Sequence, residues 1–396
     1  MRGRRWGWVG ALVIGALAAG LLPTSAGGTT EVPAAAAPAG SDAVSGPAAR
    51  AATLVSEMST AEQAASIVMG HIGGTNAAAL RDYMTGGLGG FILMGANIPP
   101  SEGELRKLTA ALTVDPLRPP LIAVDQEGGI VSRLNADGYA ASTALKSEPA
   151  SKTADAFAAR GSLVARAGIT VNFGTVADVT SDTRSFIYGR ALGTEPASAG
   201  ERVAAATTAQ EQFVASTLKH FPGHGAAPGD SHHAIPSTGT SLAEWRSSDA
   251  VPFIDGIDAG ASVLMFGHLA YTAVDSAPAS LSATWHRIAR EDLGFEGVMV
   301  TDDLGMLVAS GIPTYADPIA NAVTAVAAGN DLVLMIAGST RETAGQMAAA
   351  IAAAVDAGTL PADRLADAAT RVMTLRLEQS ASTSAWTVCD DCTPAG

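Results

Sequence analysis

Val298-Met299-Val300-Thr301-Asp302-Asp303-Leu304 is an apolar strand that runs directly into two carboxylates, which is unusual for a buried element. Alternate side chains of a strand share a face, so Val300 and Asp302 point the same way. Thr301 and Asp303 point the other way. We expect Asp303 to cap the following helix and Asp302 to face the end of the sheet, the alternative being that both carboxylates are caps.

The same unit, an apolar strand, a polar or glycine-rich turn and an alanine-rich amphipathic helix, recurs along the chain. The predicted strands are Ser66–Met69, Gly90–Met94, Leu121–Val124, Thr170–Phe173, Ser216–Lys219, Ser262–Phe266, Val298–Thr301 and Asp331–Ile336. The clearest helical patterns are Ser151–Arg166, Pro196–Phe213, Asp317–Ala328 and Arg341–Ala357. Eight strands alternating with helices imply right-handed parallel crossovers, for which a closed barrel is the economical arrangement. An open doubly wound sheet is the alternative, although no glycine-rich phosphate loop opens a helix here. The predicted fold class is α/β, a TIM-type (β/α)8 barrel in a single catalytic domain.

The N-terminal residues have the three-part pattern of a secretory signal peptide. Three arginines precede an apolar stretch from Trp8 to Leu22, and small residues follow it. The apolar stretch is short for a membrane span. We therefore predict a signal peptide over residues 1–26, with an uncleaved anchor as the alternative, and a flexible alanine-, proline- and glycine-rich spacer over 27–50. The protein is expected to be secreted or associated with the cell envelope.

Composition bounds the class of protein further. The 396 residues are 47% hydrophobic with a net charge of −14, so the chain can bury one large core, and its charge disfavours nucleic-acid partners. We assign residues 51–380 to the barrel domain and 381–396 to a C-terminal tail. In this tail Cys389 and Cys392 could form a small disulfide loop in an exported protein. We expect a monomer with no membrane span once the signal peptide is removed.

Polar side chains follow five of the predicted strands directly. They are Asn97, Asp125, His220, His268 and Asp302. The carboxyl ends of the strands of a parallel barrel meet at one mouth, where active sites form. We therefore expect these side chains to converge although they are far apart in the sequence.

The densest group of ionisable residues follows the fifth predicted strand. Lys219-His220-Phe221-Pro222-Gly223-His224-Gly225 and Asp230-Ser231-His232-His233 contain four histidines, one lysine and one aspartate. Prolines and glycines exclude a regular element, so this segment is a loop. A zinc site is one interpretation, although no H-E-x-x-H pattern or thiolate accompanies it. The other is acid/base catalysis, in which Asp230 hydrogen-bonds His232, fixes its tautomer and stabilises its protonated form.

A further strand also ends in a carboxylate, in Leu121-Ile122-Ala123-Val124-Asp125-Gln126-Glu127-Gly128-Gly129. Asp125 suits hydrogen bonds to neighbouring sugar hydroxyls. Arg133 could hold this carboxylate or reach a substrate. A purely structural ion pair would have the same pattern.

These motifs together resemble glycoside hydrolase family 3, specifically its single-domain β-N-acetylglucosaminidase branch, over about Leu54 to Leu377. The similar motifs are K-H-F-P-G-H-G at Lys219 to Gly225 with D-S-H at Asp230 to His232, D-Q-E-G-G at Asp125 to Gly129, R-S-F at Arg184 to Phe186, P-A-S-L-S at Pro278 to Ser282, and the nucleophile segment Thr301 to Leu304. The chain departs from the family pattern at Ile130, where an arginine is usual, at Met94-Gly95-Ala96-Asn97, where many members have F-x-R-N, and at Val171 to Thr175.

The resemblance implies a catalytic role for three side chains: Asp302 as nucleophile, His232 as acid/base and Asp230 as the partner of this histidine. It also implies a set of sugar-binding positions, namely Asp125, Arg133, Arg184, Lys219 and His220. It implies neither a cofactor nor a metal.

The expected activity is that of a retaining exo-β-N-acetylglucosaminidase, which removes terminal β-linked GlcNAc from peptidoglycan or chitin fragments through a covalent glycosyl-enzyme. A β-glucosidase or xylosidase of the same family is the nearest alternative. A metal-dependent hydrolase and a non-catalytic wall-binding protein are alternatives of other classes. Because a neutral imidazole base does not repel an anionic acceptor, phosphorolysis is a further hypothesis, and the absence of a sugar 1-phosphate product would end it.

Overall fold

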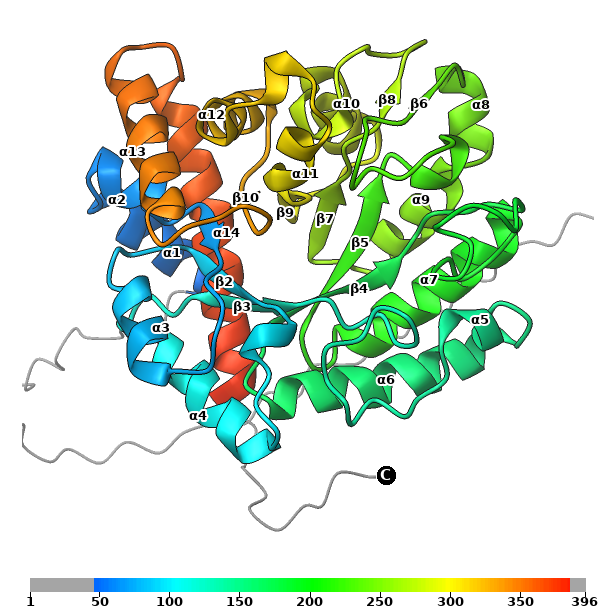
Figure 1. Cartoon of the computed structure of the whole chain (residues 1–396), viewed down its shortest axis with the longest axis horizontal. Helices are drawn as coiled ribbons and strands as arrows, with labels where there is room; N and C mark the ends of the chain where they lie inside the picture. Colours follow the sequence, from blue (N-terminus) through cyan, green and yellow to red (C-terminus); the bar gives the residue numbers. More distant parts are fainter. Residues whose placement is uncertain (1–45, 385–396) are drawn as a thin grey trace, which may run out of the picture. The chain divides into compact units, whose positions relative to one another are not determined.

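Eight parallel strands form the centre of the structure, a computed structural model that describes residues 46–384 (Figure 1). The strands of this sheet are β1 Val68–Gly70, β2 Gly90–Leu93, β3 Leu121–Val124, β4 Val171–Val176, β5 Ala215–Phe221, β7 Val263–Phe266, β9 Val298–Thr301 and β10 Val333–Leu334. Their order in the sheet is β10-β1-β2-β3-β4-β5-β7-β9. Each predicted strand overlaps one of these, and β3 and β9 have the predicted bounds. The predicted α/β barrel is confirmed.

The sheet closes between its last two strands in chain order. A parallel bridge joins Val300 of β9 to Leu332, just before β10. The buried carboxylate of Asp331 accepts a hydrogen bond from the backbone N–H of Met299 at 3.0 Å and forms an ion pair with Arg364 at 2.7 Å. A charge-assisted contact of this kind fixes β10 against β9. The closed barrel therefore brings the carboxyl ends of all the strands to one mouth.

Helices cover the outside of the barrel (Figure 1). The α-helices are α1 Pro47–Ser56, α2 Thr60–Ala65, α3 Ala77–Met84, α4 Glu102–Leu112, α5 Ser142–Leu145, α6 Ala150–Arg166, α7 Pro196–Gln210, α8 Leu242–Ser247, α9 Ala250–Asp258, α10 Ala283–Arg287, α11 Leu304–Ala309, α12 Pro318–Ala328, α13 Thr343–Asp356 and α14 Ala362–Ser384. Shorter helical turns are η1 Gly95–Asn97, η2 His224–Ala226, η3 Ala279–Leu281, η4 Ile288–Asp292 and η5 Pro313–Tyr315, and a separate parallel pair is formed by β6 Ser237–Thr238 and β8 Ala270–Tyr271. The four helical patterns quoted from the sequence correspond to α6, α7, α12 and α13.

The barrel domain begins earlier than predicted. Helix α1 starts at Pro47, inside the range 27–50 that was predicted to be a flexible spacer. Proline suits the first turn of a helix because its missing N–H has no partner to lose there. Ala51 and Val55 of this helix are buried. Because this short apolar face is packed in the core, the segment forms a helix, although its alanine-rich composition predicted a spacer.

The C-terminal boundary differs in the same direction. Helix α14 continues to Ser384, past the predicted limit at residue 380, because no glycine or proline stops it after Leu377. The predicted signal peptide, most of the spacer, and Cys389 and Cys392 lie outside the described residues. Within residues 46–384, no helix is both long and apolar enough to cross a bilayer.

Candidate active site

Of the five predicted strand-end residues, Asp125, His220 and Asp302 come together at the mouth of the barrel, whereas Asn97 and His268 are fully buried and donate to backbone carbonyls. Asp125 follows β3, Lys219 and His220 lie in β5, and Asp302 follows β9. Burial by itself raises the pKa of the Asp302 carboxyl, but the nearby rings of His220 and His268, the backbone N–H of Asp303 and the ammonium group of Lys219 hold this pKa below its usual value. Asp302 is therefore ionised at neutral pH, as a nucleophile must be.

An aromatic cluster behind β5 holds the turn that follows this strand. Phe221 packs edge-on against Trp245, with ring centroids 5.9 Å apart. The indole N–H of Trp245 donates to the carbonyl of Pro222 at 2.8 Å, and the hydroxyl of Tyr271 donates to the carbonyl of Gly223 at 2.7 Å. Gly223 has a φ of 127°, a conformation that favours glycine. The aromatic packing and these hydrogen bonds thus fix the turn after β5 and the direction of the side chains at the end of this strand.

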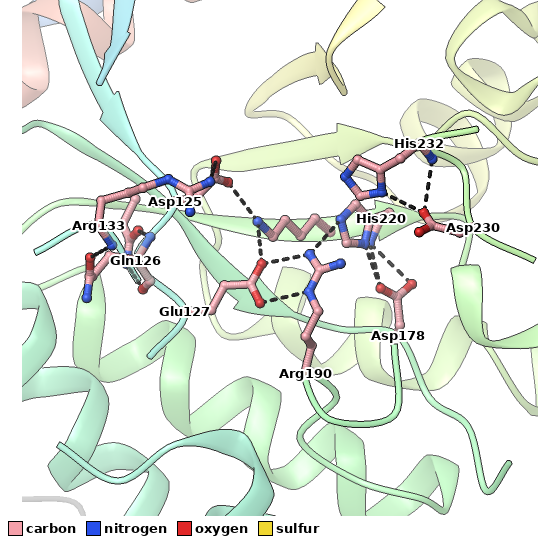
Figure 2. Close-up of polar contacts among 11 residues, drawn as sticks. Asp125, Gln126, Glu127, Arg133, Asp178, Arg190, His220, Asp230 and His232 are labelled. Atoms are coloured by element: carbon pink, nitrogen blue, oxygen red, sulfur yellow. Dashed lines mark hydrogen bonds and ion pairs between the residues drawn. The ribbon is translucent and has the colours of Figure 1, made fainter. Parts of the chain in front are cut away.

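Alternating charges form a continuous chain across the mouth (Figure 2). The Nζ of Lys219 lies 2.9 Å from Asp125 Oδ1 and 2.7 Å from Glu127 Oε1. Glu127 also binds Arg190, whose Nη2 and Nε donate at 2.7 and 3.0 Å. At the outer end, Arg133 Nη2 lies 3.3 Å from Asp125 Oδ2. Arg133 therefore holds the Asp125 carboxylate, which is the first of the two roles that its position in the sequence left open.

Asp178, which follows β4, fixes the orientation of His220. Its Oδ2 lies 2.7 Å from His220 Nδ1, and its Oδ1 accepts the backbone N–H of His224 at 2.5 Å. Arg190 Nη2 lies 3.2 Å from the other ring nitrogen of His220, Nε2. Because arginine can only donate, Nε2 accepts, and Nδ1 carries the proton that is donated to Asp178. The structure thus sets one tautomer of His220.

The neighbouring carboxylates Asp302 and Asp303 have different roles. Asp303 accepts three backbone N–H groups, from Gly305 at 2.9 Å, Ile336 at 2.7 Å and Ala337 at 2.9 Å. It therefore caps α11 and ties the end of β9 to the segment after β10. Asp302 accepts the N–H of Asp303 at 2.7 Å. The predicted division, with Asp303 as the cap and Asp302 as the residue at the mouth, is confirmed.

His268 supports the turn after β9. It is fully buried, with Nδ1 2.7 Å from Ser280 Oγ and Nε2 2.8 Å from the carbonyl of Asp303. Because a carbonyl only accepts, Nε2 carries the proton that is donated to Asp303. The histidine thus fixes the carbonyl of Asp303, the residue after Asp302.

The predicted pair of Asp230 and His232 is present on the loop after β5. The Nδ1 of His232 lies 2.6 Å from Asp230 Oδ1, and the backbone N–H of His232 donates to the same oxygen at 3.0 Å. The side chains are 55% and 40% exposed for His232 and Asp230 respectively. Phe186 contacts this imidazole at 6.3 Å between centroids and His224 at 4.7 Å, and the ring of His224 lies 6.1 Å from that of His220. A series of ring contacts thus connects the exposed pair to the mouth.

Two arginines of the loop after β4 lie in different environments. The side chain of Arg184 is 88% exposed and pairs with Asp182 at 3.1 Å, outside the charge chain. Arg190 is 9% exposed and lies inside this chain. Substrate binding by Arg184 stays a prediction, whereas the position of Arg190 against Glu127 and His220 was not anticipated. Nothing in the local sequence distinguishes the two, because the contacts that select Arg190 come from β3 and β5.

Sequence reasoning also missed Asp178 and the role of Glu127. The fourth strand was predicted to end at Phe173, but β4 continues to Val176, so that Asp178 follows the strand almost directly. With the correct strand end, the same rule that found Asp125 and Asp302 would have found Asp178. Glu127 stands in a quoted motif, but its two partners are distant in the sequence.

A zinc site in the loop requires several histidines and carboxylates around one point. Among residues 46–384, no group of three or more histidine, cysteine, aspartate or glutamate side chains is placed to hold a metal ion. Two of the four loop histidines are instead each paired with a single carboxylate, His220 with Asp178 and His232 with Asp230.

Replacing Glu127 by glutamine is expected to destabilise the fold strongly. Burial by itself raises the pKa of the Glu127 carboxyl, but Lys219 and Arg190 lower it to about 2. A group with a lowered folded-state pKa stabilises the protein fully above its unfolded value of about 4.5, and this contribution is lost as pH falls toward 2. At neutral pH the substitution leaves two buried cations facing a neutral amide, and breaking such pairs costs about 3–5 kcal/mol. Urea unfolding at pH 7 measures this cost.

The matched control is Glu102→Gln, which removes the carboxylate of a partly exposed pair with Arg166 at 3.3 Å. Such a pair contributes less than about 1 kcal/mol. Equal destabilisation by the two substitutions would contradict the structural role given to Glu127.

The barrel, the carboxylate at the end of β9 and the charge chain across the mouth are the features of a (β/α)8-barrel glycoside hydrolase. The model of the family described as glycosyl hydrolase family 3 N terminal domain matches residues 60–375, and the chain belongs to this family. It is 36% identical to a beta-hexosaminidase of Chromobacterium violaceum over 283 residues, which cover 67% of this chain and 76% of that protein.

Solved structures agree with this family assignment. A glycoside hydrolase family 3 β-N-acetylglucosaminidase from Paenibacillus sp. matches with a TM-score of 0.76 and 28% identity, covering 83% of this chain and 64% of that one. The β-N-acetylhexosaminidase from Beutenbergia cavernae matches with a TM-score of 0.69 and 27% identity, covering 81% of this chain and 99% of that one. The protein is therefore a glycoside hydrolase.

Proposed function

We propose that this enzyme removes terminal β-linked GlcNAc from glycans with retention of anomeric configuration. The observation that carries the proposal is the 2.6 Å hydrogen bond between His232 and Asp230, on a loop that ring contacts connect to the mouth where Asp302 lies. A carboxylate-supported imidazole and an ionised carboxylate are the two groups that retaining hydrolysis needs here. The names of the relatives, beta-hexosaminidase and β-N-acetylglucosaminidase, favour GlcNAc as the sugar.

The proposed reaction has two steps. Asp302 attacks the anomeric carbon and forms a glycosyl ester, while His232 donates its proton to the departing glycosidic oxygen. The neutral His232 then takes a proton from water, and the resulting hydroxide equivalent attacks the anomeric carbon and releases Asp302. Hydrogen bonds from His232 keep the pKa of Asp230 below its usual value although burial opposes this, so Asp230 stays anionic and stabilises the imidazolium.

The remaining groups of the mouth are proposed to bind the sugar. Asp125 and Lys219 form a pair of opposite charges that can accept from and donate to neighbouring hydroxyls. His220 is a further proposed sugar-binding residue, and its ring is held in one orientation by Asp178. Substrate binding by Arg133 and Arg184 is part of the same proposal.

Initial rates on the nitrophenyl β-glycosides of GlcNAc, glucose and xylose test the proposal. We expect the GlcNAc glycoside to be cleaved with the highest kcat/KM and proton NMR to show the β-anomer of GlcNAc as the first product. A preference for glucoside or xyloside would replace the proposed substrate, and first appearance of the α-anomer would exclude the double-displacement mechanism.

We also propose that the enzyme is exported and acts on cell-wall or chitin fragments outside the cytoplasm. Support comes from the arginines and the apolar stretch at the N-terminus, which lie outside the described residues. N-terminal sequencing of the protein recovered from culture medium tests this, and recovery only from the cytosol as an uncleaved chain would contradict it.

A further inference from the structure

The acid/base pair of the proposed reaction is exposed, and its hydrogen bonds stay within one loop. The imidazole Nδ1 of His232 lies 2.6 Å from Asp230 Oδ1, and the backbone N–H of His232 donates to the same oxygen (Figure 2). The two residues are two positions apart, and their side chains are 55% and 40% exposed. These hydrogen bonds therefore fix the imidazole relative to Asp230, but they do not fix the pair relative to the barrel.

A phenyl ring from a different segment contacts this imidazole. The ring of Phe186, on the loop after β4, stands nearly perpendicular to that of His232, with 86° between the ring planes and 6.3 Å between the centroids. Aromatic rings attract one another in this geometry when their centroids are roughly 4.5–7 Å apart. Phe186 is thus a point at which the acid/base loop meets another part of the chain.

Buried neighbours hold Phe186 in place. Its ring packs edge-on against that of His224, with centroids 4.7 Å apart, and His224 is almost completely buried. The guanidinium carbon of Arg190 lies 5.9 Å from the centroid of the same phenyl ring. The next residue, Ile187, is fully buried, and its carbonyl accepts the backbone N–H of Arg190 at 2.9 Å. The phenyl ring is therefore supported from the side of the barrel, whereas the imidazole beyond it is exposed.

His224 connects the phenyl ring to the mouth. The backbone N–H of His224 donates to Asp178, the carboxylate that also holds the ring of His220. Burial lowers the pKa of the His224 imidazole to about 4, and the charge of Asp302 is among those that oppose this shift. His224 therefore lies within electrostatic reach of the proposed nucleophile. The support of Phe186 is thus part of the same end of the barrel as Asp302.

We propose that Phe186 is a positioning residue, which holds the imidazole of His232 in the orientation that protonates the departing oxygen. The inference rests on the proposed function. With Nδ1 bonded to Asp230, the proton must leave from Nε2, so rotation of the imidazole moves this proton away from the departing oxygen. Misplacing a reacting group by about 1 Å costs on the order of 10²-fold in rate. A ring contact that limits this rotation therefore affects the step that needs the acid.

The substitution Phe186→Leu tests this role, because it removes the ring and keeps a large apolar side chain. A GlcNAc disaccharide has a leaving group that needs the proton, whereas nitrophenyl β-GlcNAc has one that does not. We expect kcat/KM to fall about tenfold on the disaccharide and less than about threefold on the nitrophenyl glycoside, since aromatic contacts of this kind change an equilibrium by up to roughly tenfold. An equal loss on both substrates, or no loss on the disaccharide, overturns the proposal.

The same substitution in a His232→Ala background shows whether Phe186 acts through the imidazole. If it does, Phe186→Leu changes kcat/KM on the disaccharide by less than about twofold once the imidazole is gone, because coupled residues are not additive. A further loss as large as in the wild-type background would mean that Phe186 acts through the stability of the fold or directly on the substrate. That result also overturns the proposal.

Two further variants serve as controls. Phe186→Tyr retains the ring and is expected to keep the wild-type ratio of the two rates. Tyr188→Leu removes an aromatic ring from the same segment, one that packs against the ammonium group of Lys146 at 3.9 Å from its centroid. It is also expected to keep the wild-type ratio. A ratio as low as that of Phe186→Leu in either variant counts against a specific contact between Phe186 and His232.

Failure of the proposed function is separately visible. If His232 is not the acid, His232→Ala lowers both rates equally, and the roles of both residues are then excluded. If His232→Ala shows the expected dependence on the leaving group and Phe186→Leu does not, only the role of Phe186 is overturned.

Discussion

Replacing Asp302 by alanine is expected to lower kcat on nitrophenyl β-GlcNAc at least about 10⁴-fold, the order of loss seen when a member of a covalent catalytic unit is removed. The carboxylate is the group that the structure places at the mouth in ionised form, and no other described side chain takes its role in the proposed reaction. The free energy of unfolding should change little, because Asp302 accepts its backbone hydrogen bond from its own neighbour, Asp303. Steady-state kinetics and urea unfolding of the purified variant measure the two quantities.

The adjacent Asp303→Ala variant is the matched control. It removes the acceptor of three backbone N–H groups, from Gly305, Ile336 and Ala337. An unsatisfied buried donor costs about 1–3 kcal/mol, so a loss of about 3 kcal/mol or more is expected. An Asp302→Ala variant that is inactive but fully stable, together with an unstable Asp303→Ala variant, would distinguish the nucleophile from the helix cap. Retention of more than a hundredth of the wild-type rate by Asp302→Ala would exclude Asp302 as the nucleophile.

Replacing His232 by alanine should produce a loss that depends on the leaving group. A general acid contributes about 10²–10⁴-fold, and a poor leaving group such as a sugar needs this proton whereas nitrophenolate does not. The expected result is a loss of about this size in kcat/KM on a GlcNAc disaccharide and a loss of less than about tenfold on nitrophenyl β-GlcNAc. The parameter kcat/KM is the informative one, because it reports the step in which the glycosyl-enzyme forms.

His233→Ala provides the control for this substitution, since His233 is an exposed histidine in the adjacent position. It is expected to keep the wild-type ratio of rates on the two substrates. The Asp230→Ala variant should lie between the two, because it leaves the imidazole in place and removes the carboxylate 2.6 Å from it. An equal loss on both leaving groups would count against His232 as the acid.

Local patterns predicted much of the fold and carried the resemblance from which the catalytic roles are proposed. Each strand of the barrel was found because an apolar run followed by a polar residue is visible within a few positions, as in Val298 to Asp302, whereas the short pair β6 and β8 was not predicted. The different roles of Asp302 and Asp303 follow from the alternation of side chains along one strand. The pairing of Asp230 with His232 involves positions two residues apart, so the chain brings them together without help from the rest of the fold.

The boundaries of the domain were less accessible from the sequence. Alanine-rich segments such as residues 47–50 suit both a spacer and a helix, and only packing of Ala51 and Val55 decides between them. The end of β4 could not be predicted from the local sequence either. Gly174 weakens the apolar pattern after Phe173, but pairing with β5 continues the strand.

By itself, the sequence determined the barrel and the identity of the proposed nucleophile and acid/base, since each is written in a short run of residues. Only the tertiary structure decided that Arg190, and not Arg184, lies at the mouth. It also decided that Glu127 holds Lys219 and Arg190 there and that Asp178 holds His220. The physical reason is that Glu127 meets Arg190 63 residues away. A buried charge takes its partner from whichever strands closure of the barrel places beside it, and no local pattern encodes that choice.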